Sequence, residues 1–315
     1  MTRIARLLAG ACACAALWSS PALAQESPDP DTEYVLEPKG PSGPTFTLRF
    51  EGSHAFSADL DDNGEVQVSR SGVALGVRQP LGDRLTLDTR FGFEYSHYNF
   101  DDADIEGTDS PFSDVYSGGI FAILSYKIDE QWSVNGAGFV AAAGEFDADF
   151  GDSIFGGGGV SLGWRQSERF FIAFGADIRT RLEDDPIVTP QIVIRWQATD
   201  DLRVETIDLP QGVGIGVTTE FAEAWEATLY AGFSLRQYRL NDDGPGRLAD
   251  GVVRDTRVPV GLRFTWKPST LISLSIDGGA YVYQEYEFVR SSGVEFDEIE
   301  TDPAPFVGLR LSLRF

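Results

Sequence analysis

From Thr45 to Phe315, most of the chain consists of segments in which apolar and polar residues alternate one by one. The clearest segment runs from Leu85 to Tyr98, where Leu, Thr, Phe and Tyr occupy the odd positions and Asp, Arg, Glu and Ser recur at the even ones. Successive side chains of a strand point to opposite faces, so this pattern predicts strands with one apolar and one polar face. Helical spacing of apolar residues does not recur at useful length. We therefore expect an all-β fold.

The alternating segments are long. The pattern recurs in Val258 to Trp266 and again in Ile272 to Phe288. Most segments reach or exceed the ~9–11 residues that a tilted strand needs to cross the hydrocarbon layer, whereas strands of soluble proteins average about 5–6 residues. This length predicts strands that cross a membrane.

The connections between segments alternate between short turns and long, acidic loops, as expected for an up-and-down barrel with turns at one end and loops at the other. Counting segments between them predicts an antiparallel barrel of fourteen strands. The stretch Asp201 to Gly216 is short for a hairpin, so twelve strands stay open. Aromatic residues gather at the predicted strand ends, in the position of interfacial girdles. They are Tyr95, Tyr98 and Phe100 at one end and Tyr126, Trp132, Trp164, Trp196, Trp225 and Trp266 at the other.

The last segment is the most specific feature of the chain. Its apolar positions are Val307, Leu309, Leu311, Leu313 and Phe315, and Gly, Arg or Ser stands between them. An alternating strand that ends on Phe resembles the assembly signal of outer-membrane β-barrel proteins, and the resemblance extends from about Thr45 to Phe315. It implies a bacterial outer-membrane protein that the barrel-assembly machinery inserts among outer-membrane lipid and lipopolysaccharide.

The first residues carry the marks of a secretory signal peptide. Arg3 and Arg6 precede an apolar run from Leu7 to Trp18, and Ala22-Leu23-Ala24 forms a small-x-small cleavage pattern. We therefore expect a signal peptide at residues 1–24, a flexible Pro-rich acidic lead-in at 25–44, and the barrel at 45–315. The apolar run is too short for a membrane anchor, which needs ~20 residues.

Composition excludes several classes of function. Both cysteines lie within the predicted signal peptide, which excludes disulfides and thiolate metal sites from the mature chain. The net charge of −24 argues against nucleic acid as a partner. Apolar residues make up 42% of the chain and aromatic residues 12%, which is too much for a disordered protein. No sequence feature requires a cofactor.

The polar face of the predicted strands should line the lumen, and its charged members are the candidate site residues. They are Asp88, Arg90, Glu94, Asp177, Arg179, Arg181, Arg195, Arg203, Glu205, Arg236, Arg263, Asp277, Glu285 and Arg310. Two interpretations stay open. The charges could form a constriction that selects solutes, or an ion-pair lattice that fills a narrow barrel. The first predicts a passive pore for small hydrophilic solutes, and the second a closed structural or adhesive barrel with acidic outer loops.

One acidic turn partly matches a calcium-binding loop. Asp59, Asp61, Asn63 and Gly64 fit the opening of that motif, but Arg70 stands where the bidentate Glu should be. We therefore expect no defined metal site here. Weak binding of divalent cations by the acidic loops is a separate expectation.

A lipid-modifying enzyme is the third class considered. It would need a serine paired with a histidine base, and His54 and His97 have Ser53, Ser57 and Ser96 nearby. His97, however, shares the face of the apolar residues, and no lipase signature surrounds either histidine. We expect no catalytic residues. The glycine run at 156–159 is not followed by the helix that a phosphate-binding loop requires, so it favours close packing in a strand.

Overall fold

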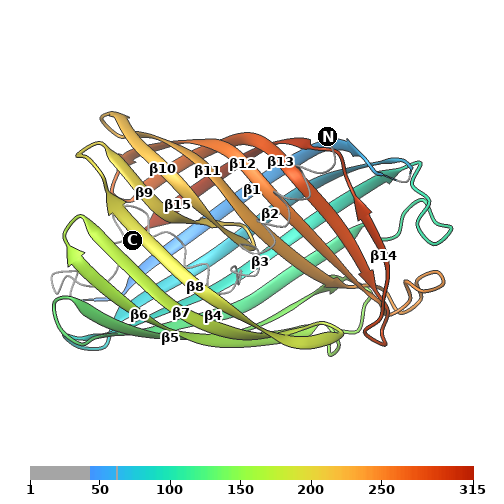
Figure 1. Ribbon diagram of the computed structural model, residues 1–315, viewed down its shortest axis with the longest axis horizontal. Coiled ribbons are helices and arrows are strands. Elements are labelled where there is room, and N and C mark those ends of the chain that lie inside the picture. Colours follow the sequence, from blue (N-terminus) through green and yellow to red (C-terminus); the bar gives the residue numbers. More distant parts are fainter. Residues whose placement is uncertain (1–42, 62) are drawn as a thin grey trace.

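The computed structural model describes residues 43–61 and 63–315, and nearly all of them lie in strands or in the connections between strands (Figure 1). The strands are β1 (Thr45–Asp59), β2 (Glu65–Pro80), β3 (Leu85–Asp101), β4 (Asp114–Lys127), β5 (Trp132–Glu145), β6 (Ile154–Ser167), β7 (Phe170–Arg181), β8 (Asp184–Gln197), β9 (Leu202–Leu209), β10 (Gly212–Ala222), β11 (Trp225–Arg239), β12 (Val252–Ser269), β13 (Ile272–Val289), β14 (Glu295–Glu300) and β15 (Ala304–Arg314). In this part of the chain, no helix is long and apolar enough to span a membrane.

The strands form one closed antiparallel barrel. Each strand pairs with its neighbours in sequence, and the sheet closes where β15 lies between β1 and β13. β14 is not a separate position in the wall, because Glu300 stands opposite Glu285 and Ala304 opposite Tyr281 in one continuous register. The two pieces are one strand interrupted at 301–303. The wall therefore has fourteen strands, which confirms the predicted number over the alternative of twelve.

The outer surface of the barrel is apolar. Phe50, Ile120 and Leu229 are among the many large side chains exposed on it. At the end with the short turns, Trp132 stacks on Trp164 and Trp225 on Trp266, each pair with ring centroids 6.2 Å apart. An apolar belt bounded by aromatic residues is the surface of a barrel in lipid. The chain is a transmembrane β-barrel, as the alternation predicted.

The wall has an open seam between β8 and β9. These strands pair over only three residues each, from Arg195 opposite Glu205 to Gln197 opposite Arg203. From this point toward the outer loops they diverge (Figure 1). The β9–β10 hairpin is also short and turns back at Pro210 and Gln211. Residues 184–194 of β8 consequently have no strand partner on the β9 side among the described residues.

Two prolines fit this seam. The amide of Ile194 donates to the Thr206 hydroxyl of β9 at 3.0 Å, so the even-numbered amides of β8 point toward β9. Pro186 and Pro190 share this parity and have no amide hydrogen to donate. Proline is tolerated in a sheet where its position faces no ladder partner. The sequence of β8 is therefore that of an edge strand on this side.

β5 and β11 meet at the outer end of the barrel, beyond the tip of the short β9–β10 hairpin. Arg239 of β11 pairs in parallel with Gly144 of β5, and a Cβ at Gly144 would lie 2.9 Å from the Arg239 carbonyl oxygen. The buried Arg239 guanidinium also binds the carbonyl oxygens of Asp152 and Asp250 and the carboxylate of Glu183. One arginine thus joins three outer loops over the short hairpin.

Candidate solute pathway

The half of the lumen nearer the short turns holds a lattice of ion pairs. Arg263 binds Asp277 at 2.6 Å, and Arg203 binds Glu205 at 2.7 Å. Other pairs are Arg310 with Glu51 at 3.5 Å, Arg49 with Asp208 at 3.8 Å and Arg78 with Asp88 at 3.7 Å. Arg90 lies near Arg49 and Asp208, and Arg195 stands opposite Glu205 in the register of β8 and β9. These predicted lumen residues are close enough to one another to neutralise much of their charge.

Above this lattice, a second group of charges crosses the lumen. We call Arg70, Glu94, Tyr98, Arg236, Asp255 and Arg257 the lumen bridge. Asp255 of β12 accepts hydrogen bonds from Arg70 of β2 at 2.8 Å, from Tyr98 of β3 at 2.6 Å and from both Nε and Nη2 of Arg257 at 2.7 and 2.8 Å. Asp255 and Arg257 are 0% exposed. This half of the bridge connects strands that are not neighbours in the wall.

The other half of the lumen bridge is a bidentate pair. Arg236 of β11 donates to both carboxylate oxygens of Glu94 on β3, at 2.8 and 3.0 Å, and to the carbonyl oxygen of Pro210 at 3.1 Å. Two parallel hydrogen bonds fix the planar guanidinium against the carboxylate. The pair ties the tip of the short β9–β10 hairpin to the opposite side of the barrel.

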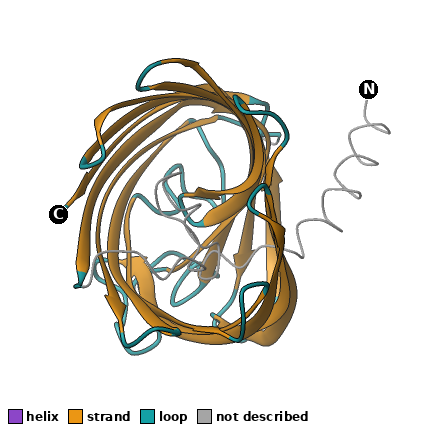
Figure 2. Cartoon of the chain, turned by 90° about the vertical axis from the view of Figure 1, so that its left-hand side faces the viewer, coloured by secondary structure: helices purple, strands orange, loops and turns teal. Residues whose placement is uncertain are grey.

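The mouth of the barrel is filled by apolar side chains. Phe100 and Phe288 of the wall pack with Phe112 of the β3–β4 loop, and the loops also bury Ile105 and Leu248. The aromatic rings contact edge to face, with centroids 5.2 to 6.2 Å apart. Figure 2, a view along the barrel from the short-turn end, shows loops within the outline of the wall. The outer loops thus fold inward, which the sequence had left open.

Two predicted placements were wrong. Tyr98 and Phe100 were expected in the outer aromatic girdle, but they are buried in the lumen because the even positions of β3 face inward with Glu94. Glu285 was expected in the lumen. A bulge pairs Val258 with Tyr283 but Pro259 with Tyr281, and this extra residue in β13 reverses the alternation beyond it. Tyr286 therefore faces the core, and Glu285 faces outward.

Besides the misplaced Tyr98, three members of the lumen bridge were missed by the sequence analysis: Arg70, Asp255 and Arg257. The signal was present in β12, where Asp255 and Arg257 share the odd positions with the predicted Arg263. Arg70 belongs to a segment of small and polar residues in which the alternation is weak.

A cavity of about 150 Å³ lies beside the lumen bridge, at the level of the open seam. Its lining includes the predicted residues Arg179, Arg181 and Arg236, together with Phe155 of β6 and Tyr238 of β11. Arg181 binds Asp184 at 2.6 Å. The remaining predicted lumen residue, Asp177, is buried and accepts a hydrogen bond from Thr189 at 2.9 Å.

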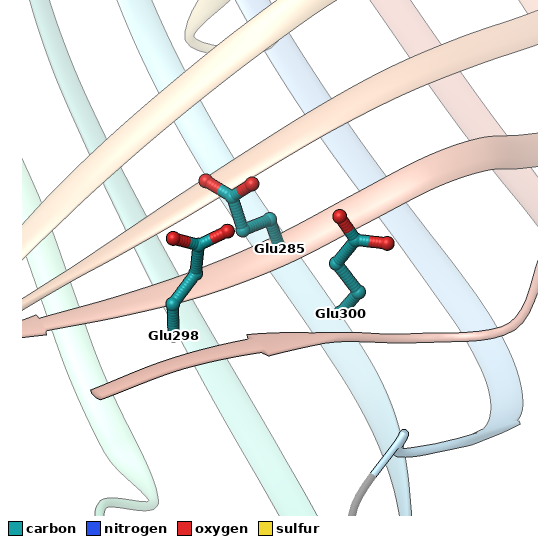
Figure 3. A group of neighbouring side chains, drawn as sticks. All are labelled: Glu285, Glu298 and Glu300. Carbon is teal, nitrogen blue, oxygen red and sulfur yellow. The ribbon is translucent and has the colours of Figure 1, made fainter. Parts of the chain in front are cut away.

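Outside the lumen, glutamates gather where β13 pairs with β14. Carboxylate oxygens of Glu285, Glu298 and Glu300 lie within 4.8 Å of one another, and the three side chains converge in Figure 3. In the partial calcium motif, Asp59, Asn63 and Gly64 line an open loop cavity of about 430 Å³. Both groups belong to the acidic outer end of the barrel.

The two histidines lie on the outer surface and are not joined into a catalytic set. His54 Nδ1 contacts the Ser69 hydroxyl at 2.9 Å, and His97 Nδ1 contacts the Asp114 carboxylate at 2.8 Å. Within residues 43–61 and 63–315, neither histidine is hydrogen-bonded to both a serine and a carboxylate. Ser96 is buried on the opposite face of β3 from His97.

The predicted assembly strand is β15 with the residue that follows it. Val307, Leu309 and Phe315 are exposed on the outer surface, and Phe315 stacks on Phe46 with ring centroids 6.1 Å apart. The alternation predicted for this strand is confirmed, while its reading by the assembly machinery stays a prediction. The predicted signal peptide and most of the lead-in lie outside the described residues.

Comparisons with known proteins identify a family and distant structural similarity. A family described as "Domain of unknown function (DUF6268)" matches residues 89–313. No curated protein matches. Similar solved structures include an outer membrane channel from Pseudomonas putida F1, with 12% identity, a TM-score of 0.48 and coverage of 88% of this chain and 97% of that one.

Two further similar structures are a toluene transporter and a homologue of FadL. The toluene transporter TodX of P. putida has 8% identity and a TM-score of 0.44, and the similarity covers 95% of this chain and 93% of that one. The Pseudomonas aeruginosa FadL homologue has 10% identity and a TM-score of 0.42, with coverage of 86% and 89%.

Proposed function

The chain belongs to the DUF6268 family, and we propose that it is a narrow passive channel for small hydrophilic solutes, closed in the conformation described above. The observation that carries this proposal is the lining of the lumen, where ionisable side chains extend from the lattice near the short turns through the lumen bridge. Ionisable residues at membrane depth are costly and typically mark pathways for solutes or ions.

The energetics of buried charges support a channel over an inert filling. Replacing a buried ion pair by well-packed apolar residues is often neutral or stabilising by about 1–4 kcal/mol. A barrel that only needed a solid interior would be at least as stable with an apolar one. The buried Asp255 with its two arginines instead keeps a polar surface available along the axis once the mouth opens.

The proposed gate is the apolar mouth together with the lumen bridge. Phe112, Ile105 and Leu248 come from outer loops rather than from the wall, so they can leave the lumen without breaking the barrel. Loops are the elements whose local opening costs least. Solutes would then pass the bridge and follow the charged lattice to the periplasmic end.

A closed structural barrel is the second candidate. The packed aromatic mouth favours it, because the lumen is filled in the conformation described. In that case the function of the protein would reside in the acidic outer loops rather than in the lumen.

Swelling of proteoliposomes distinguishes the two candidates. Vesicles containing the full chain should swell in an isosmotic solution of a small sugar such as arabinose faster than protein-free vesicles. They should not swell faster in a large oligosaccharide. Swelling equal to that of protein-free vesicles in arabinose would overturn the channel and leave the structural barrel. A variant of the exposed pair at the periplasmic turn, Arg169→Gln, is the matched control and should behave as the wild type.

A further inference from the structure

We propose that the cavity beside the lumen bridge is a binding site for a small monocarboxylate with an apolar body. The carboxylate would pair with Arg179 and receive a hydrogen bond from Tyr238. The residues of the cavity alone support a binding site, whereas the binding of solutes there during passage through the barrel rests on the proposed channel function.

Arg179 is a buried cation that forms no hydrogen bond or ion pair with a side chain of the described residues, although the charge of Asp177, two positions earlier in β7, acts on it. It is 8% exposed, and its Nε has no hydrogen-bond partner among the described residues. A buried guanidinium without a hydrogen-bonded carboxylate is costly, and such groups are normally paired. An unpaired arginine that lines a cavity indicates an anionic ligand.

Tyr238 is the second unpartnered group in the same cavity. It is 1% exposed, and its hydroxyl has no hydrogen-bond partner in the described part of the chain. Buried polar groups are almost always hydrogen-bonded. Two independent side chains, from β7 and β11, thus leave donors unused around one cavity. A carboxylate, which accepts several hydrogen bonds, can satisfy both.

The other charges of the cavity restrict the ligand to a single negative charge. Arg254 binds Asp184 at 2.8 Å and also binds Glu287, and Arg181 binds the same Asp184. Their charges are therefore already compensated. The Arg179 guanidinium, to which no carboxylate of the described residues is hydrogen-bonded, can hold a monocarboxylate by two parallel hydrogen bonds. A dianion such as phosphate would be repelled by Glu287 in the lining and by Asp177 near Arg179, and Arg179 alone would have to bind it.

The remaining walls and the volume define the body of the ligand. Phe155 and Leu235 supply apolar surface beside the charged groups. The cavity measures about 150 Å³, the size of an engineered apolar cavity that holds benzene. A ligand with a ring or a short alkyl chain on its carboxylate, such as benzoate, therefore fits by both charge and size.

The cavity lies level with the open part of the wall. Arg179 stands opposite Ile187 of β8, which belongs to the stretch without a partner on the β9 side. Gln211, at the tip of the short hairpin, forms another part of the lining. The shortness of β9 and β10 is thus what leaves room for the site between β7 and β11.

Titration calorimetry on the purified full-length protein in detergent tests the site with benzoate as the probe. Benzyl alcohol, which has a similar body and no charge, is the control ligand. The wild type should give saturable heat with benzoate only. Arg179→Gln should weaken benzoate binding by about tenfold or more, because it removes a charge-assisted pair. Tyr238→Phe should weaken it less, and Arg169→Gln should not change it. Heat-modifiable migration in electrophoresis checks that each variant is folded.

Two results would overturn the site. One is the absence of saturable benzoate binding by the folded wild type. The other is undiminished binding by folded Arg179→Gln. Vesicle swelling is a separate readout, so benzoate binding without swelling refutes the channel alone, and swelling without benzoate binding refutes the site alone.

Discussion

Asp255 is the residue on which most of the lumen bridge depends. It compensates Arg70 and Arg257 at once, and its side chain is 0% exposed. Removing one partner of a buried ion pair leaves an uncompensated charge and typically costs about 3–5 kcal/mol. The contribution of Asp255 is therefore much larger than that of any exposed pair on the turns.

Asp255→Ala should lower the free energy of unfolding by about 3–5 kcal/mol, because two buried arginines lose their counterion. Asp200→Ala, which removes the exposed partner of Arg169, should lower it by at most about 1 kcal/mol. Urea titration in lipid vesicles, followed by circular dichroism, measures both. Equal midpoints for the two variants would show that the bridge does not hold the barrel together.

A second residue-scale prediction concerns pH and the outer loops. A hydrogen bond from Arg247 lowers the pKa of Glu106 below its usual value of 4.5. The pair therefore stabilises the folded loops fully above pH 4.5, and this contribution is lost as the pH falls through the lowered pKa. Carboxylate NMR titration of Glu106 should show this lowered pKa in the wild type and a return toward 4.5 in Arg247→Gln. The same pKa in both proteins would contradict the assignment.

Among the elements, β8 and β13 show how far the sequence alone could predict the fold. Period-two alternation and turn residues sufficed for the barrel and its strand number. The bulge in β13 could not be predicted from the sequence, because one inserted residue leaves apolar and polar residues alternating on each side of it. The shift in register appears only when β13 is paired with Val258 and Pro259 of β12. Glu285 was misplaced for this reason.

Likewise, neither the seam beside β8 nor the surroundings of Arg179 could be predicted from the pattern of a single strand. Pro186 and Pro190 were a usable sign of an edge position, but edges arise only from the relative lengths of neighbouring strands. Arg179 was predicted to be a lumen residue, and in the structure it is buried and lines the cavity beside the lumen bridge. That no carboxylate of the described residues is hydrogen-bonded to it depends on side-chain geometry, and alternation contains no such information.

Hydrogen exchange tests the seam. The amides of Val188 and Ile192 point toward β9 with the same parity as Ile194 but have no strand partner there among the described residues. They should exchange faster than the amides of Thr189 and Gln191, which point toward β7. NMR of the protein in detergent micelles resolves the four amides. Equal protection of both sets would mean that β8 and β9 pair along their length in solution.

The acidic outer end gives a prediction for divalent cations. Glu285 stands directly opposite Glu300 in the β13–β14 ladder, and like charges in such pairs destabilise each other. The sequence expectation of weak calcium binding by the acidic loops is tested by calorimetry with calcium chloride. If the double variant Glu298→Gln/Glu300→Gln gives less heat than the wild type, calcium binds at this cluster. The absence of heat from the wild type would refute the expectation.

For the whole molecule, distribution of charge is the unifying feature. The chain has a net charge of −24, and acidic residues gather on its outer loops. The lumen bridge instead contains three arginines against two carboxylates. The interior is thus more cationic than the exterior, as a route for small anionic or polar solutes requires.

Single-channel recording in planar bilayers tests the proposed gated channel most directly. The wild type should show brief current steps of constant size. Glu94→Ala/Arg236→Ala removes both partners of one crossing pair without leaving a buried charge, so it should raise the open fraction. A flat baseline for both the wild type and this variant, with both proteins shown to be folded, would contradict the channel and leave a closed structural barrel.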